Sequence, residues 1–266
     1  MNGHAILITP QDLMMASVLV VAAGLVSLGL GLGLERRLAI ASVRTVVQLL
    51  LIGYVLRYIF QAESGWPIAA MLCVMFLAAS HASVQRVSRS FRGDLTLTFF
   101  TLVVVGLATT YCVTGMVISV EPWYRPQYLI PLLGMVLGNS LTGISLCLDS
   151  LLESLSEGRE VVEMELAHGA TRWEAAQAPI RRAVQKSMIP TLNAMTVVGI
   201  VSLPGMMTGQ ILAGADPLEA VKYQIVVMFM LAAATSVGSV GVAVFSCRVL
   251  FNERHQLCGD KKLRSR

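Results

Sequence analysis

The sequence alternates between long apolar stretches and short polar connections. Seven of the stretches have about 20 residues each, the length that an α-helix needs to cross the hydrocarbon core of a bilayer. They are Leu13–Leu34, Leu38–Phe60, Trp66–Val84, Leu95–Ile118, Tyr128–Leu148, Met188–Ala213 and Ile225–Phe245. Backbone groups in lipid must be hydrogen-bonded within their segment, and the sequence lacks the strict alternation of barrel strands. The pattern therefore predicts an all-α polytopic membrane protein with about seven transmembrane helices.

Composition and charge agree with this pattern. Hydrophobic residues make up 55% of the 266 residues and charged residues only 14%, and the mean hydropathy is +0.70. A soluble protein carries about 25% charged residues, so most of the surface of this chain has to face lipid. The net charge of +4 does not indicate a nucleic-acid partner, because the basic residues are sorted between the two sides of the membrane.

The basic residues also predict the orientation of the chain. Of the 20 Lys and Arg residues, 16 lie after the first, third and fifth spans or in the carboxyl-terminal tail. Because cytoplasmic connections carry such an excess, we expect the amino terminus outside and the carboxyl terminus in the cytoplasm. Trp66, Trp123 and Tyr124 fall at the predicted outer boundary, where aromatic rings anchor helix ends. No basic residue precedes the first span, so it is expected to remain in the mature protein and not to be a cleaved signal peptide.

The longest polar segment, residues 149–187, is predicted to be cytoplasmic and to form a helix, a sharp turn and a second helix. Gly169 suits the left-handed residue that ends a helix, and Thr171 with Glu174 three residues later has the pattern of a capping box. One interpretation is a pair of solvated, oppositely charged helix faces. The other is a docking element for a cytosolic protein, in which Trp173 anchors in a pocket of the partner.

Three polar residues within the second and fifth spans are candidates for a transport pathway. Arg44 and Gln48 lie four residues apart and so share one helix face, where a central charge costs roughly 2.5 to 3.5 kcal/mol on insertion scales. Arg44 either extends its side chain to the membrane boundary or contributes, with Gln48, to the pathway or to a bond with Asn139. Asn139 follows Gly134 and Gly138, which have the spacing of a close helix contact.

The sixth span is the least regular. Pro204-Gly205 interrupts it and frees backbone carbonyls, which are tolerated at membrane depth only inside protein or beside a water-filled cavity. The methionines that follow either fill gaps in the core or contact a cargo, and their thioethers suit Cu(I) better than Fe(II). The candidate pathway residues here are Ser202, Pro204, Gly205, Met206, Met207 and Gln210.

Cysteine and histidine do not have the spacing of a zinc site or a disulfide framework. Among the five cysteines, Cys73, Cys112 and Cys147 lie in apolar stretches, where they are expected to be buried as small hydrophobic residues. His81 is expected to be hydrogen-bonded in the interior and not to be a ligand. Asp216, which precedes a proline, has the pattern of the N-terminal cap of the last helix.

Three runs of the sequence closely resemble the FetB-type family of iron-exporting permeases. They are SVRTVVQLLLIGYVLRYIF from Ser42, GMVLGNSL from Gly134 and VGIVSLPGMMTGQILAGADPLEAVKYQI from Val198. The similarity extends through nearly the whole chain. It implies a single transmembrane permease domain over residues 1–266 in the bacterial inner membrane. In that family the permease works with a separate ATPase, and the pair is associated with iron efflux and resistance to oxidative stress.

A looser resemblance places the docking site. Glu163 stands six residues before Gly169, as in the Glu-Ala-Ala loop of ABC transporter permeases, although Met164 and Glu165 replace its alanines. The resemblance implies that residues 149–187 couple to the ATPase and that two copies of the permease face each other. The docking residues that it implies are Glu163, Glu165, Gly169, Ala170, Thr171 and Trp173.

The chain has no G-x-x-x-x-G-K-[ST] phosphate loop, so we expect no enzyme activity and no cofactor in this subunit, with ATP on the partner. Two alternatives stay open. One is an ABC permease for another metal or an organic solute. The other is a secondary transporter or channel without an ATPase, against which stands the scarcity of Asp and Glu in the spans.

Overall fold

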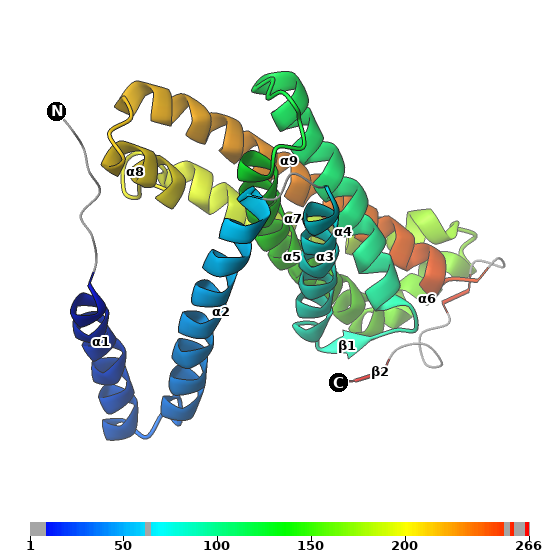
Figure 1. The fold of residues 1–266 in the computed structure, drawn as a ribbon. Helices are drawn as coiled ribbons and strands as arrows, with labels where there is room; N and C mark the ends of the chain where they lie inside the picture. Colours follow the sequence, from blue (N-terminus) through cyan, green and yellow to red (C-terminus); the bar gives the residue numbers. More distant parts are fainter. Residues whose placement is uncertain (1–8, 62–64, 253–255, 258–263, 266) are drawn as a thin grey trace. The chain divides into compact units, whose positions relative to one another are not determined.

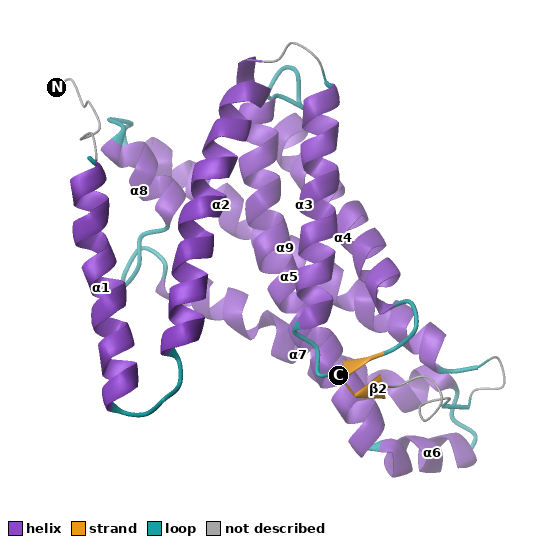
Figure 2. Ribbon diagram, turned by 60° about the horizontal axis from the view of Figure 1, so that its bottom comes forward, coloured by secondary structure: helices purple, strands orange, loops and turns teal. Residues whose placement is uncertain are grey.

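A computed structural model describes residues 9–61, 65–252, 256–257 and 264–265, and most of this chain is helical (Figures 1 and 2). The helices are α1 Pro10–Gly29, α2 Glu35–Gln61, α3 Trp66–Gln85, α4 Asp94–Tyr111, α5 Pro126–Glu157, α6 Arg159–Ala167, α7 Arg172–Val197, α8 Gly205–Leu212 and α9 Pro217–Leu250. A π-helix, η1 Cys112–Val117, continues α4. The strands β1 Arg89–Ser90 and β2 Arg264–Ser265 pair antiparallel. Cys258 lies outside the described residues.

Within the described chain, six helices are long and apolar enough to cross a membrane: α1, α2, α3, α4 with η1, α5 and α9. This confirms the all-α polytopic class. The predicted sixth span is not one helix, because α7 ends at Val197 and α8 begins at Gly205. The count of seven spans and the orientation of the chain stay predictions.

The internal contacts divide the chain into two compact units, residues 1–67 with 212–215 and residues 68–211 with 216–266. In the first unit α1 and α2 form an antiparallel helical hairpin (Figure 1). Its turn contains Gly31 and Gly33, with φ values of +62° and +66°. The buried hydroxyl of Ser27 ties the turn together, since it accepts from the Leu34 N–H at 3.0 Å and donates to Glu35 Oε2 at 3.1 Å.

In the second unit α5 is the central helix, and α4, α7 and α9 pack against it. Helix α3 is joined to α5 by buried hydroxyl groups, because the Oγ atoms of Ser83 and Ser145 lie 3.1 Å apart and Ser145 donates to the Ser83 carbonyl at 3.0 Å. The connection after α3 is also fixed to α5, since the Ser88 N–H donates to Asp149 Oδ1 at 2.9 Å. All these bonds lie towards the α6 end of α5.

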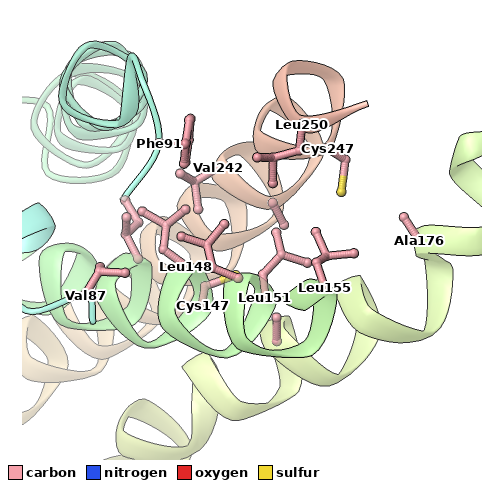
Figure 3. Packing of buried hydrophobic residues seen from close by; sticks show 14 of the residues in the cluster. Val87, Phe91, Cys147, Leu148, Leu151, Leu155, Ala176, Val242, Cys247 and Leu250 are labelled. Atoms are coloured by element: carbon pink, nitrogen blue, oxygen red, sulfur yellow. The ribbon is translucent and has the colours of Figure 1, made fainter. Parts of the chain in front are cut away.

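The larger apolar core lies at the same end. Leu148, Leu151 and Leu155 of α5 pack with Ala176 of α7 and Leu250 of α9, and each is at most 1% exposed (Figure 3). A smaller cluster lies towards the other end of α5 and is built around Leu132, Val136, Val227 and Met230. Full burial of a Leu side chain contributes about 1.5 to 3 kcal/mol, so the α6 end is the better stabilised part of the bundle.

A glycine of α5 allows a close helix contact, but it is not one of the predicted pair, Gly134 and Gly138. A Cβ added at Gly134 would only touch Met75 Cε at 3.5 Å, and one at Gly138 would meet nothing within 4 Å. The close approach occurs instead at Gly143, where an added Cβ would lie 2.4 Å from Thr235 Cγ2 of α9. The spacing of Gly134 and Gly138 is right for close packing, but their side of α5 is not the side that faces α9.

Three other predictions need correction. Cys147 is buried as expected, whereas Cys73 and Cys112 are exposed on apolar helices. His81 is also exposed, and its Nε2 lies 2.9 Å from Nε2 of Gln85 on the next turn of α3. A single sequence shows that these stretches are apolar but not which side of each helix is covered, and that side decides the burial of one residue.

Candidate functional site

The turn between α6 and α7 is a compact reversal of the chain. The His168 N–H donates to the Met164 carbonyl at 3.0 Å, and the Ala170 N–H donates to the Glu165 carbonyl at 3.1 Å. Between them Gly169 has a φ of +94°, which lies in the left-handed region that side chains disfavour. The prediction that Gly169 ends a helix in this conformation is confirmed.

Thr171 and Glu174 form the predicted capping box at the start of α7. Thr171 Oγ1 accepts the Glu174 N–H at 3.4 Å, while the Thr171 N–H donates to Glu174 Oε2 at 2.7 Å. The bond from the Thr171 N–H, together with a bond from its hydroxyl at 2.8 Å, holds the pKa of the Glu174 carboxyl below its ordinary value. The box fixes the first turn of α7 and so defines where the reversal ends.

Helix α6 presents one exposed face beside this turn. The face carries Val161, Met164, Glu165 and His168, which recur with the spacing of one helix side. The opposite side holds Val162, which is 3% exposed in the core. Glu163 is engaged within the helix, because Arg159 Nε lies 2.6 Å from its Oε1. The exposed face thus places two apolar side chains, Val161 and Met164, beside the Glu165 carboxylate.

Trp173 packs onto its own chain. Its ring is half-buried against the larger core cluster, and the guanidinium carbons of Arg172 and Arg248 lie 5.7 and 5.8 Å from its centroid. Arg248, in the last turn of α9, also lies 5.8 Å from the ring of Phe245. Trp173 therefore joins the turn to the carboxyl end of α9, and its insertion into a partner stays a prediction.

Between α7 and α8 the chain leaves the helical conformation over residues 198–204. Gly199 adopts a φ of +81°, and its N–H donates to the Ser202 carbonyl at 2.9 Å, which makes a tight local loop. The Pro204 carbonyl then accepts the Thr208 N–H at 3.0 Å and starts α8. The predicted interruption at Pro204-Gly205 is present, but it begins earlier, at Val198.

A pocket of about 520 Å³ lies within the second unit, beside α8. It is lined by Ile118 after η1, by Gln127, Tyr128, Pro131, Leu132 and Met135 of α5, by Met206 and Gln210 of α8, and by Tyr223 of α9. The size is that of a small-molecule site, and the lining combines apolar walls with a few polar groups. The Oε1 atom of Gln210 is buried and has no hydrogen-bond partner within the described chain. A buried acceptor without a partner costs about 1 to 3 kcal/mol, so a ligand or water that donates to it would be favoured.

The structure brings together two of the pathway residues predicted for the sixth span, Met206 and Gln210. Met207 is half-buried but does not line the pocket, and Ser202 is exposed in the loop before α8. Pro204 and Gly205 position the first turn of α8.

The other predicted pathway residues lie elsewhere. Arg44 and Gln48 are exposed on α2 in the first unit. Asn139 is exposed on α5 in the second unit, and its Nδ2 donates to the Met135 carbonyl of its own helix at 3.0 Å. A bond between Arg44 and Asn139 stays a prediction.

Several residues of the site escaped the sequence analysis. Gln127, Tyr128 and Tyr223 fall at predicted ends of spans, where such residues are common boundary anchors, and only the fold brings them to one pocket. Val161 and Met164 belong to an amphipathic helix whose exposed side is known only once Val162 is placed in the core.

Comparisons with known proteins give one consistent result. The family described as Uncharacterised protein family UPF0014 matches residues 10–251. The chain is 34% identical over 257 residues to the probable iron export permease protein FetB of Escherichia coli, covering 97% of both chains. It is 37% identical over 232 residues to a UPF0014 membrane protein of Synechocystis, covering 85% of this chain and 88% of the relative. It is 35% identical over 243 residues to the protein ALUMINUM SENSITIVE 3 of Arabidopsis thaliana, covering 91% of this chain and 87% of the relative. No solved structure matches.

Proposed function

Because the chain belongs to the UPF0014 family of membrane proteins and is similar over its length to a probable iron export permease, we propose that it is the permease subunit of an ABC transporter. It exports iron from the cytoplasm of a bacterium across the inner membrane, as two copies, and contributes to resistance against oxidative stress. A separate ATPase supplies the energy, since the sequence has no phosphate loop of its own.

The observation that supports the proposal most directly is the well-defined turn at Gly169. Its left-handed glycine and capping box hold the α6 face at a defined angle to α7. A rigid turn with the exposed pair Val161 and Met164 beside it is suited to receive a partner, because little conformational freedom is lost when it binds. This surface is where the ATPase docks.

The pocket beside α8 is the proposed cargo site. It lies in the same unit as the turn, and α7 and α9 extend from one region to the other. Helix α7 starts at the turn and leads through the 198–204 loop to Met206 and Gln210, while α9 starts beside Tyr223 and ends at Arg248 against Trp173. ATP-driven movement at the turn is therefore transmitted to the pocket through two packed helices.

The decisive experiment is copurification followed by ATP hydrolysis. The tagged full-length chain should recover an ABC ATPase, and iron should stimulate ATP hydrolysis by the pair in lipid vesicles. The Met164→Asp variant should lose the ATPase, because a charge at the centre of an apolar contact is costly, and it should still insert in the membrane. Arg182→Ala, at an exposed position of α7 away from the turn, is a control that should still recover the ATPase. Recovery of no nucleotide-binding partner, together with ATP-independent transport, would establish a secondary transporter instead.

A second cargo is favoured by one relative, whose name refers to aluminium. Vesicles that contain the complete complex should be tested with ferrous iron, ferric iron and aluminium in parallel. Iron as cargo predicts that iron alone stimulates both hydrolysis and export, and that cells without the protein retain more iron under iron load. Equal iron retention in cells with and without the protein would contradict iron as the cargo. Whether the chain is an ABC permease would then still be tested by copurification with the ATPase.

A further inference from the structure

The open side of α5 differs from the open sides of α4 and α9, which carry mainly apolar side chains. α5 is the most buried of the six apolar helices, because α3, α4, α7 and α9 pack against most of its surface. One side of α5 is not covered by another helix within the described part of its unit. This side carries Gln127, Pro131, Met135, Gly138, Asn139 and Thr142, all exposed or half-buried. We call these six residues the α5 stripe.

The α5 stripe is continuous along the helix. Its members are separated by three or four residues or are adjacent, so they occupy one sector of the helix surface. From Gln127 to Thr142 the stripe covers about 22 Å at 1.5 Å per residue, most of the roughly 30 Å of a bilayer core. Its first members, Gln127, Pro131 and Met135, already line the pocket. At its other end Arg86 donates to Thr142 Oγ1 at 3.3 Å.

The exposed sides of α4 and α9 have the apolar side chains that contact with lipid favours. Phe100 and Val104 of α4 and Phe229 and Val237 of α9 are 58 to 64% exposed. In α5, which is described along its whole length, the exposed large apolar side chain is Tyr128, at the pocket. An amide or a hydroxyl that faces hydrocarbon is unfavourable, so the stripe is not suited to lipid.

Asn139 is the most informative member of the stripe. It uses one amide hydrogen for the Met135 carbonyl, which leaves its Oδ1 for another partner. Gly138 beside it leaves open space, since an added Cβ would meet no atom within 4 Å. A polar side chain beside open space at mid-helix is suited to contact with water, because an amide that faces hydrocarbon is unfavourable.

We infer that the α5 stripe is one wall of the cargo route, which begins at the pocket beside α8 and continues along α5 to the level of Thr142. The inference rests on the proposed transport function and specifies where the cargo travels. The wall offers the neutral amides of Gln127 and Asn139, which exchange hydrogen bonds with a hydrated cargo and do not hold it tightly. It ends where the Arg86 guanidinium and the Gly138 carbonyl engage the Thr142 hydroxyl.

Access of water to the stripe tests this placement directly. In membranes that contain the full chain and its ATPase, Asn139→Cys and Thr142→Cys should react with a water-soluble thiol reagent, and ATP should change their rate of labelling. Val104→Cys and Phe229→Cys are matched lipid-side controls and should stay unreactive. Peptide mass spectrometry separates these sites from the native cysteines, of which buried Cys147 serves as an internal negative control. If Asn139→Cys is as unreactive as Val104→Cys, the route does not pass along α5.

Blocking the route provides an independent readout. Gly138→Leu should fold normally, because its Cβ meets no atom and Leu favours helix, but it should reduce iron export by about tenfold or more. Gly53→Leu makes the same change on α2, also with open space, and should leave export unchanged. If Asn139→Cys forms a disulfide between two copies and is not labelled by the reagent, the stripe is an interface between two permease copies. That outcome overturns the route but leaves iron-stimulated ATP hydrolysis, and with it the proposed function, intact.

Discussion

The guanidinium carbon of Arg248 lies 5.8 Å from the centre of the Trp173 ring, so the last turn of α9 is fastened to the first turn of α7. The same guanidinium lies 5.8 Å from the ring of Phe245. Both helices lead from this contact towards the pocket, at Tyr223 on α9 and through the 198–204 loop to α8. The contact thus joins the proposed docking turn to both helices that lead to the proposed cargo site.

Removing this contact should weaken the turn. Arg248→Ala should lower the free energy of unfolding by about 0.5 to 1 kcal/mol, the usual size of an exposed cation–π interaction, and should uncouple ATP hydrolysis from transport. Arg248→Lys should retain part of both, since the ammonium keeps the charge but not the planar stacking. Thermal unfolding in detergent and hydrolysis by the pair measure the two effects. Arg182→Ala, another exposed arginine of this unit, should change neither.

The left-handed conformation of Gly169 gives a second prediction. Gly169→Val should strain the backbone by about 1 to 2 kcal/mol and abolish coupling to the ATPase, while the chain still inserts in the membrane. Gly169→Asn should keep most of the coupling, because Asn tolerates a positive φ. Full transport by the valine variant would show that the turn is not the site of docking. Membrane fractionation and ATP hydrolysis of the copurified pair are the measurements.

The capping box predicts a dependence on pH. The pKa of Glu174 is lower in the folded chain than its ordinary value of 4.5, so the folded state favours the ionised carboxyl. The stabilisation from this group is therefore complete above the ordinary value and is lost as the pH falls through the lower, folded-state value. Melting curves of the natural chain and of Glu174→Ala should differ at pH 7 and converge in acid. A difference that does not vary with pH would exclude this contribution.

Gln210 should show opposite effects on stability and function. Gln210→Leu removes a buried acceptor that has no partner within the described chain, so the variant should be as stable as the natural chain or more stable. Stimulation of ATP hydrolysis by iron should fall by about tenfold, the equivalent of losing one hydrogen bond of about 1.4 kcal/mol to the cargo. Met207→Leu, on the same helix but away from the pocket lining, is the control. Unchanged stimulation in Gln210→Leu would remove this residue from the cargo site.

The contact between α5 and α9 should be sensitive to a single methyl group. Gly143→Ala places a Cβ 2.4 Å from Thr235 Cγ2 and should cost about 1 to 3 kcal/mol by overpacking. Adding Thr235→Ser removes the opposing methyl and should restore most of the loss. Gly134→Ala, which only touches the end of Met75, should be nearly neutral. Unfolding temperatures of the three variants decide this, and failure of the double variant to recover would place the strain elsewhere.

The class of the protein and its local capping signals follow from the amino-acid sequence alone. Long apolar stretches specify transmembrane helices because lipid leaves the backbone no other partner, and a capping box or a left-handed glycine acts within a few neighbouring residues. Thr171, Glu174, Gly169 and the Asp216 cap, which accepts from the N–H groups of Leu218 and Glu219, therefore agree with the structure. The family resemblance, carried by the runs from Ser42, Gly134 and Val198, is likewise a property of the sequence.

Which side of each helix is covered becomes known only when the helices are packed against one another. Gly138 and Gly143 are equally suited to close packing by residue type, yet α9 lies against Gly143 and leaves Gly138 open. From the sequence, Trp173 is predicted to be an anchor for a partner, whereas in the structure it packs against the core and Arg248. Gln127 has the position of a boundary residue in the sequence, whereas in the structure it lines a pocket with residues of α8 and α9. Such facts depend on contacts between segments far apart in the chain, and the spacing of residues along one helix does not specify which neighbour packs against it.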